Sequence, residues 1–189
     1  MGFTDALFGR KKLKEPAADR LFAITTAAVT LETGCGLKPA GKGAVIFKPL
    51  SAGEFSQVDA DVNELLKSVA AGSGSTLDRK KDSFGFEWIV IEDSDLEDQV
   101  AGVHAVADEF QERGFGAQLL AAAFLFSGDA HPVYWIYGFK RGAFWPFVPT
   151  GEKQERDNAR ELELKAKLEL ELPIEPDLSR WLGLFDAPI

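Results

Sequence analysis

Two spacings of hydrophobic residues alternate along this chain, and each predicts a different kind of element. A period near two, or a short unbroken apolar run, is typical of strands because successive side chains of a strand point to opposite faces. Helices instead repeat their apolar positions every three or four residues. Strands are predicted at residues 44–48, 86–91, 119–126 and 133–139, followed by an arm at residues 144–148. Helices are predicted at residues 17–33, 51–71, 95–113 and 158–172.

Some of these segments carry conflicting signals. Residues 17–33 have a helical stripe but contain β-branched threonines and a valine that a strand tolerates, and we interpret them as a helix. In residues 158–172 leucines alternate with charged residues as in a strand, yet Glu, Leu, Lys and Ala are strong helix formers, so we predict a helix. Residues 76–83 are polar and fit a solvated strand or a loop. The glycines and Pro39 in residues 34–43 predict a loop.

Together these elements predict a single α+β domain. We expect a mostly antiparallel or mixed sheet of about five strands, with three to four helices packed on it, because short local connections favour antiparallel neighbours. The domain spans residues 15–189 and includes the C-terminal helix and a tail that docks its aromatic side chains on the body. Residues 1–14 form a separate amphipathic and basic N-terminal arm.

The densest aromatic stretch of the chain is residues 134–149, which also holds two adjacent cations, two glycines and two prolines. Its first arm, residues 134–139, is interpreted as a buried strand. In the second arm Pro146 lacks a backbone N–H, so this arm lies at a sheet edge or leaves the sheet. Two interpretations stay open for the second arm and the turn. They belong to the core, or they form a partner-binding surface of Lys140, Arg141, Phe144, Trp145 and Phe147.

The N-terminal arm combines apolar and basic side chains. A helix would place Phe3 and Leu7 on one face, with cations following them. This arrangement predicts a contact with a membrane surface. The residues concerned are Phe3, Leu7, Phe8, Lys11 and Lys12. The alternative is a frayed arm or a docking peptide, because isolated helices of this length are marginally stable.

Composition narrows the classes of function. The chain of 189 residues has a formal net charge of -9, which argues against nucleic-acid binding because phosphate contacts need a basic face. Cys35 is the single cysteine, so no intramolecular disulfide is possible, and its glycine neighbours favour an inert thiol over a nucleophile. Without an apolar run long enough to span a bilayer or a signal-peptide core, we expect a cytoplasmic protein, and a peripheral contact with the inner face of the membrane stays open.

Candidate chemistry is sparse. The acidic run at Glu92, Asp93, Asp95, Glu97 and Asp98 offers oxygens to a divalent cation, but it lacks the spacing of a calcium loop and reads better as a helix start. His104 and Asp108 are one helical turn apart and are interpreted as a structural pair, with acid or base chemistry as the alternative. We therefore expect no catalytic residue, metal or cofactor. A small-ligand or metal-binding protein or enzyme using His104, Asp108 and the acidic run stays open, as does a homo-oligomeric module.

Several motifs are shared with one known family. They are Met1-Gly2-Phe3, residues 26–31, residues 86–90, Gly114-Phe115-Gly116 with Leu119-Leu120, residues 134–137, residues 140–144, Pro146-Phe147, and residues 175–181. With these the chain resembles the phage-shock protein A-associated protein, AB member, a small bacterial and archaeal family, over nearly its whole length. The resemblance implies a non-enzymatic accessory of an envelope-stress response. It also implies, as partner, a membrane-remodelling PspA-type protein or a membrane metalloprotease. It carries over no catalytic residue.

Overall fold

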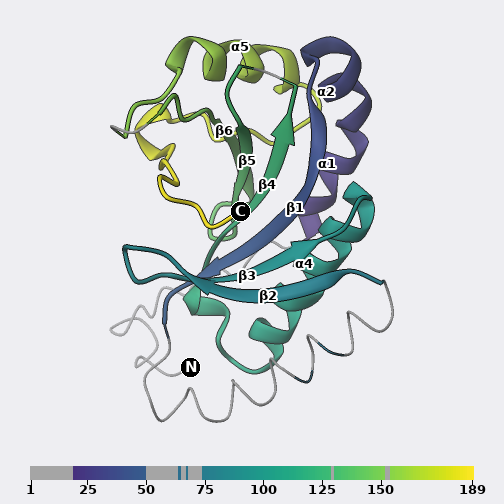
Figure 1. Cartoon of the computed structure of the whole chain (residues 1–189), viewed down its shortest axis with the longest axis vertical. Helices are drawn as coiled ribbons and strands as arrows, with labels where there is room; N and C mark the ends of the chain where they lie inside the picture. Colours follow the sequence, from purple (N-terminus) through teal and green to yellow (C-terminus); the bar gives the residue numbers. More distant parts are fainter. Residues whose placement is uncertain (1–18, 50–63, 65–66, 68–73, 129, 152–153) are drawn as a thin grey trace, which may run out of the picture.

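One six-stranded antiparallel sheet organises the protein (Figure 1). The structure, a computed structural model, describes residues 19–49, 64, 67, 74–128, 130–151 and 154–189. The strands are β1 (Lys38–Phe47), β2 (Thr76–Lys81), β3 (Glu87–Glu92), β4 (Leu119–Ser127), β5 (Val133–Gly138) and β6 (Ala143–Phe147). Their order across the sheet is β2-β3-β1-β4-β5-β6, and every neighbouring pair is antiparallel. This confirms the α+β class, with six strands where the sequence predicted about five.

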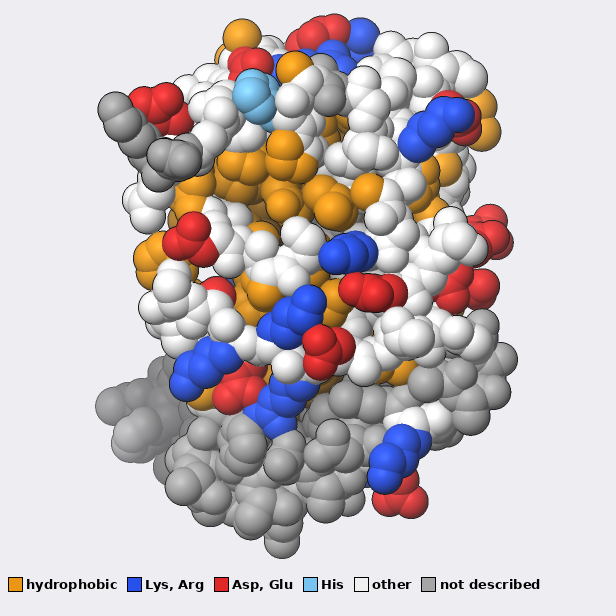
Figure 2. All heavy atoms as spheres, in the orientation of Figure 1, with side chains coloured by type: hydrophobic (Ala, Val, Ile, Leu, Met, Phe, Trp, Pro, Cys, Tyr) orange, Lys and Arg blue, Asp and Glu red, His pale blue; other side chains and the backbone are white. Residues whose placement is uncertain are grey.

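The two edge strands differ in composition. The additional strand is β2, whose polar sequence had left a strand and a loop equally open, and it lies at one edge. Its run of charged side chains suits an edge because charges discourage pairing with another sheet. Figure 2 shows hydrophobic side chains gathered above a band of Lys, Arg, Asp and Glu side chains that follows β2 and β3. β6, which contains Pro146, lies at the other edge, as the missing N–H predicts.

The central strand β1 is longer than its sequence suggests. We expected a loop up to residue 43 and a strand only from Ala44, but β1 begins at Lys38. The first residues of β1 pair with the end of β4, where Lys38 lies opposite Ser127. A register shift between Pro39 and Gly43 then absorbs the proline and the glycines. The loop prediction was therefore wrong, because pairing with a distant strand holds these residues extended.

Of the described α-helices, α4 and α5 begin where a side chain satisfies a free backbone N–H group, whereas α1 and α2 have no side-chain cap. They are α1 (Ala23–Thr26), α2 (Ala28–Cys35), α4 (Leu96–Glu112) and α5 (Asn158–Leu168), with 3-10 turns η1 (Asp19–Phe22), η2 (Gly116–Gln118) and η3 (Leu178–Arg180). Asp95 caps α4 by accepting a hydrogen bond from Glu97 N at 2.7 Å. Asp157 caps α5 in the same way through Arg160 N at 2.9 Å. The helices predicted at residues 17–33 and 158–172 are confirmed, although α5 ends at Leu168.

All the described α-helices contribute to one face of the sheet. Figure 1 shows α1 and α2 to the right of β1, α4 behind β2 and β3, and α5 across the upper end of the sheet. Alternate strand residues, such as Val45, Ile89 and Trp135, meet helical side chains such as Val103 and Leu164 in one continuous buried cluster. We call this cluster the helical core. Successive side chains of a strand point to opposite faces, so the helical core holds only about half of the apolar strand residues.

The opposite face is covered by the C-terminal segment, by which we mean residues 175–189. Trp88, Ile136 and Phe147 point to this face and form a second buried cluster with Trp181. Further side chains of the segment pack against this cluster, namely Leu184, Phe185, Ala187 and Ile189. The predicted docking of the aromatic tail is thereby confirmed. The N-terminal arm at residues 1–14 lies outside the described residues, as does nearly all of the helix predicted at residues 51–71.

Candidate functional site

The predicted partner surface centres on the turn between β5 and β6. Gly138 O accepts hydrogen bonds from Arg141 N at 3.1 Å and from Gly142 N at 2.8 Å, which closes the turn. Gly142 has a φ of +65°, a left-handed conformation that favours glycine, as its position in the turn predicted. Lys140 and Arg141 are both exposed at this turn. The two cations therefore lie where the sequence placed them.

The three aromatic residues of that predicted surface are buried. Phe144 and Phe147 are fully buried and Trp145 is nearly so, which agrees with the core interpretation of these three residues and not with the partner-binding one. Phe144 belongs to the helical core, whereas Trp145 and Phe147 belong to the core under the C-terminal segment. β6 is an edge strand only in its backbone pairing, because both of its faces are covered. Of the five residues of the predicted surface, only the cations Lys140 and Arg141 are exposed.

The segment after α5 also covers part of the β6 edge. Phe144 N donates to Pro173 O at 2.7 Å, and Glu175 N donates to Phe144 O at 2.9 Å. These bonds form a short parallel bridge between Phe144 and Ile174. A bare strand edge is a template for pairing with other chains, and here part of it is occupied. The bridge also brings Glu175 beside the β5–β6 turn.

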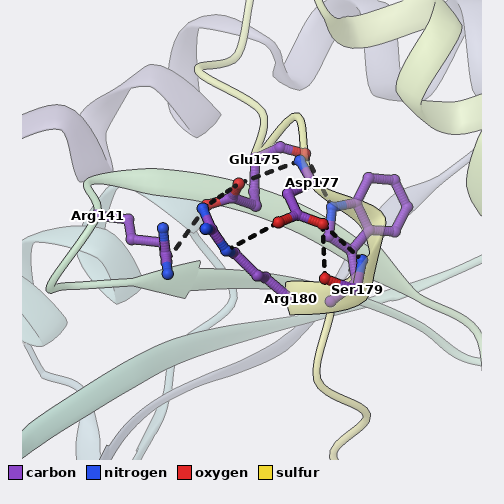
Figure 3. A network of polar contacts seen from close by, with 6 residues as sticks. Arg141, Glu175, Asp177, Ser179 and Arg180 are labelled. Atoms are coloured by element: carbon purple, nitrogen blue, oxygen red, sulfur yellow. Dashed lines mark hydrogen bonds and ion pairs between the residues drawn. The ribbon is translucent and has the colours of Figure 1, made fainter.

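A buried glutamate joins the turn to the C-terminal segment (Figure 3). The Glu175 side chain is only 4% exposed, and its two carboxylate oxygens lie 3.4 Å from Arg141 Nε and 3.6 Å from Arg180 Nη1. Asp177 N also donates a hydrogen bond to Glu175 Oε1 at 3.1 Å. A buried carboxylate needs such partners because desolvation disfavours its charge. Glu175 therefore positions two guanidinium groups from different parts of the chain.

The neighbouring carboxylate fixes the second of these arginines. Asp177 Oδ2 lies 3.0 Å from Arg180 Nε, and the Ser179 hydroxyl donates to Asp177 Oδ1 at 2.6 Å. The Ser179 hydroxyl holds the pKa of the Asp177 carboxyl below its usual value. The Arg141 and Arg180 side chains keep 45% and 47% of their surface exposed. We call Lys140, Arg141 and Arg180 the cationic surface. Together with the carboxylates of Glu175 and Asp177, which pair with its arginines, it has a formal charge of +1 on a protein of formal net charge -9.

Arg180 and Glu175 were not singled out as site residues from the sequence. Residues 175–181 entered only through the resemblance, and no local spacing links Glu175 to Arg141. The contact depends on the bridge between Phe144 and Ile174, which joins segments far apart in the chain. A weak signal was present, because Glu175 lies between Pro173 and Pro176, where the chain leaves helical structure.

The residues considered for acid, base or metal chemistry have structural contacts. His104 Nδ1 lies 3.0 Å from Asp108 Oδ2, and the His104 ring is 5.1 Å from the Phe22 ring. Within the acidic run, Asp93 accepts hydrogen bonds from Asp95 N and Ser75 Oγ, which lower the pKa of its carboxyl. Over the described residues, no three His, Cys, Asp or Glu side chains gather as metal ligands. Cys35 is buried, and this desolvation raises the pKa of its thiol.

The predicted membrane-surface residues Phe3, Leu7, Phe8, Lys11 and Lys12 lie outside the described residues. Their role stays a prediction. In the part of the chain that the structure describes, no helix has the length and apolarity needed to cross a bilayer.

Fold and site define an α+β protein with one antiparallel sheet and a turn whose arginine is held by a buried glutamate. A family model described as PspA associated protein B matches residues 1–189, the whole chain. The chain belongs to this family, which confirms the resemblance found in its motifs. The family name makes it a PspA-associated protein and is consistent with an accessory role in a phage-shock response. No curated protein and no solved structure matches the chain.

Proposed function

We propose that this protein is a non-enzymatic accessory of a bacterial phage-shock envelope-stress response that binds a PspA-type partner through the cationic surface. The observation that carries the proposal is the buried carboxylate of Glu175 between two half-exposed guanidinium groups, in a chain whose family is PspA-associated. Lys140, on the same turn, adds a third cation. The buried aromatic residues of β6 support the turn from below and do not contact the partner.

Preorganisation is the physical reason for choosing this surface. Binding normally costs side-chain entropy, and a long arginine side chain loses much of its freedom when it is fixed. Here Glu175 restricts Arg141 and Arg180 before a partner arrives, while half of each side chain is still accessible. Guanidinium groups are enriched at the centres of protein interfaces, and they match carboxylates in shape and charge. The complementary surface on the partner is therefore acidic.

The test compares charge reversal at this surface with charge reversal elsewhere. Arg141→Glu and the control Arg113→Glu change the net charge equally, and Arg113 lies at the end of α4, paired with Glu109. Binding to the purified PspA-type protein from the same organism is measured by calorimetry or interferometry. Arg141→Glu is expected to weaken binding about tenfold, and added salt is expected to weaken the wild-type complex, because the contact is a charged one in water.

Three results bear directly on the proposal. The proposal is supported if Arg141→Glu loses affinity for the PspA-type protein and Arg113→Glu keeps the wild-type affinity. Equal affinity of both variants and the wild type refutes the cationic surface, and no binding by the wild-type protein refutes the accessory role itself. The membrane metalloprotease, the N-terminal membrane contact and self-association stay predictions of the sequence.

A further inference from the structure

An apolar groove opens on the sheet face that the C-terminal segment covers. Its volume is about 390 Å³, within the range of ligand and anchor pockets. Its floor consists of buried side chains from five strands, namely Ile46, Trp88, Ala121, Ile136 and Trp145. Residues 182–185 of the C-terminal segment form one wall. The turn between β2 and β3 forms the other wall, and Ser83 Oγ in this turn lies 3.3 Å from Asp186 Oδ2 of the segment.

Large apolar side chains stand exposed along the rim of this groove. Phe84 is 57% exposed, Phe86 is 36% exposed and Leu182 is 67% exposed. The turn that carries the two phenylalanines is firmly built, because Asp82 Oδ1 accepts from Phe84 N and Phe86 N, each at 2.9 Å. A firm turn presents these side chains without a folding cost on binding. Contiguous exposed apolar surface of this kind marks an interaction site.

Two ionisable side chains line the groove, and they are not equally available. Both oxygens of Asp82 are engaged, since Asp82 Oδ2 accepts a hydrogen bond from Trp88 Nε1 at 2.9 Å. Lys48 is exposed, and within the described residues its ammonium group has no hydrogen-bond or ion-pair partner. The charge that the groove offers to a ligand is therefore positive. An apolar ligand bearing a carboxylate is complementary to it.

We propose that the groove docks a segment of the PspA-type partner that inserts a large apolar side chain over Trp88 and Trp145 and brings a carboxylate to Lys48 Nζ. This inference rests on the proposed function, because it assigns a second contact to the same partner. A protein segment fits better than a small ligand, since Phe84 and Leu182 at the rim need a partner broad enough to cover them. Aromatic-walled pockets that receive one anchor side chain are typical centres of binding energy.

The experiment uses exposed rim residues, whose replacement leaves the cores intact. Phe84→Ser, Leu182→Ser and Lys48→Glu are compared with Leu170→Ser, an apolar residue 97% exposed just beyond α5 and away from the groove. Affinity for the purified PspA-type protein is measured for each. The dye anilinonaphthalene sulfonate, an apolar ring system with an anionic group, reports separately on the groove. Each rim variant is expected to lose about tenfold in affinity for the partner and to bind less dye, and Leu170→Ser is expected to match the wild type.

The outcomes separate this inference from the proposed function. The groove is supported as the docking site if the PspA-type protein displaces the dye from the wild-type protein and the rim variants lose affinity for the partner. Rim variants that bind the partner as tightly as Leu170→Ser overturn the groove and leave the accessory role standing. A wild-type protein that does not bind the partner overturns both. Binding to phosphatidylglycerol vesicles that depends on Phe84, without any effect of Phe84→Ser on the partner, overturns it in favour of a lipid contact.

Discussion

Replacing two tryptophans by phenylalanine, one at a time, tests how the C-terminal segment is attached to the sheet. Trp145 in β6 donates a hydrogen bond from Nε1 to Leu182 O of that segment at 3.0 Å. Trp135 in β5 is fully buried in the helical core, and within the described residues its Nε1 has no hydrogen-bond partner. Each substitution removes the same part of the indole ring. Trp145→Phe removes an indole N–H that donates a hydrogen bond, whereas Trp135→Phe removes an indole N–H that has no acceptor among the described residues.

The expected magnitudes follow from this difference. The missing ring atoms cost about 1–2 kcal/mol in each variant, as lost apolar burial and a small cavity. Trp145→Phe also loses a hydrogen bond of about 1 kcal/mol, which brings its total to about 2–3 kcal/mol. Trp135→Phe instead removes a buried unpaired donor, whose desolvation costs about 1–3 kcal/mol, so its net change is near zero. The two variants should differ by about 2–3 kcal/mol.

Differential scanning calorimetry measures this difference. For a protein of this size, about 1 kcal/mol shifts Tm by roughly 2–4 °C, so Trp145→Phe should melt about 5–10 °C below Trp135→Phe. Urea titration of both variants gives the free energies independently. If Trp135→Phe proves as destabilising as Trp145→Phe, the Trp135 indole N–H is satisfied in the folded protein and the reasoning fails.

Three further predictions concern the scaffold. Gly128→Ala should lower the unfolding free energy by about 2–5 kcal/mol in thermal melts, because the φ of Gly128 is +118° and a Cβ there would lie 2.2 Å from a backbone oxygen. The control Gly114→Ala, at a φ of +81° with open space around it, should lose only about 1–2 kcal/mol. Equal losses in the two variants would refute the clash at Gly128. Asp95→Ala should cost about 1 kcal/mol by removing the α4 cap, and an unchanged urea midpoint would contradict this. Burial raises the pKa of the Glu161 carboxyl above its ordinary value of 4.5. The protonated carboxyl therefore stabilises the folded protein fully below pH 4.5, and this stabilisation is lost as the pH rises through the pKa of the folded state. The unfolding free energy of wild type relative to Glu161→Gln should therefore fall as pH rises from about 4.5, and a flat difference would count against the shift.

Local signals in the sequence predicted much of the fold because they act within a few residues. Pro146 cannot donate to a neighbouring strand, and β6 is an edge strand. Helix propensity outweighed the alternating leucines of residues 158–172, and α5 formed there. The early start of β1 at Lys38 was missed because the pairing with β4 that extends it comes from a distant segment. Residues 34–43 taken alone do read as a loop.

The candidate site was predicted from the sequence only where it depends on local features of the chain. Lys140 and Arg141 lie on the predicted turn, since glycine and chain reversal are local features. Burial of Phe144 and Phe147 depends on helices and on a C-terminal segment that a window of aromatic residues does not reveal. The pairing of Arg141 with Glu175 likewise needs the Phe144–Ile174 bridge. In β6, Phe144 points to one face and Trp145 and Phe147 point to the other, and a local window of sequence does not show what covers either face.

The cover over the second sheet face has a consequence for biosynthesis. The groups that fasten the segment come from earlier strands, since Lys80 Nζ donates to Pro188 O, 108 residues later in the chain. Synthesis proceeds from the N-terminus, so all six strands leave the ribosome before the segment that covers Trp88 and Phe147. The nascent sheet therefore carries an uncovered aromatic face until translation reaches this segment. A pause in translation after β6 would leave this face open to chaperones and to aggregation.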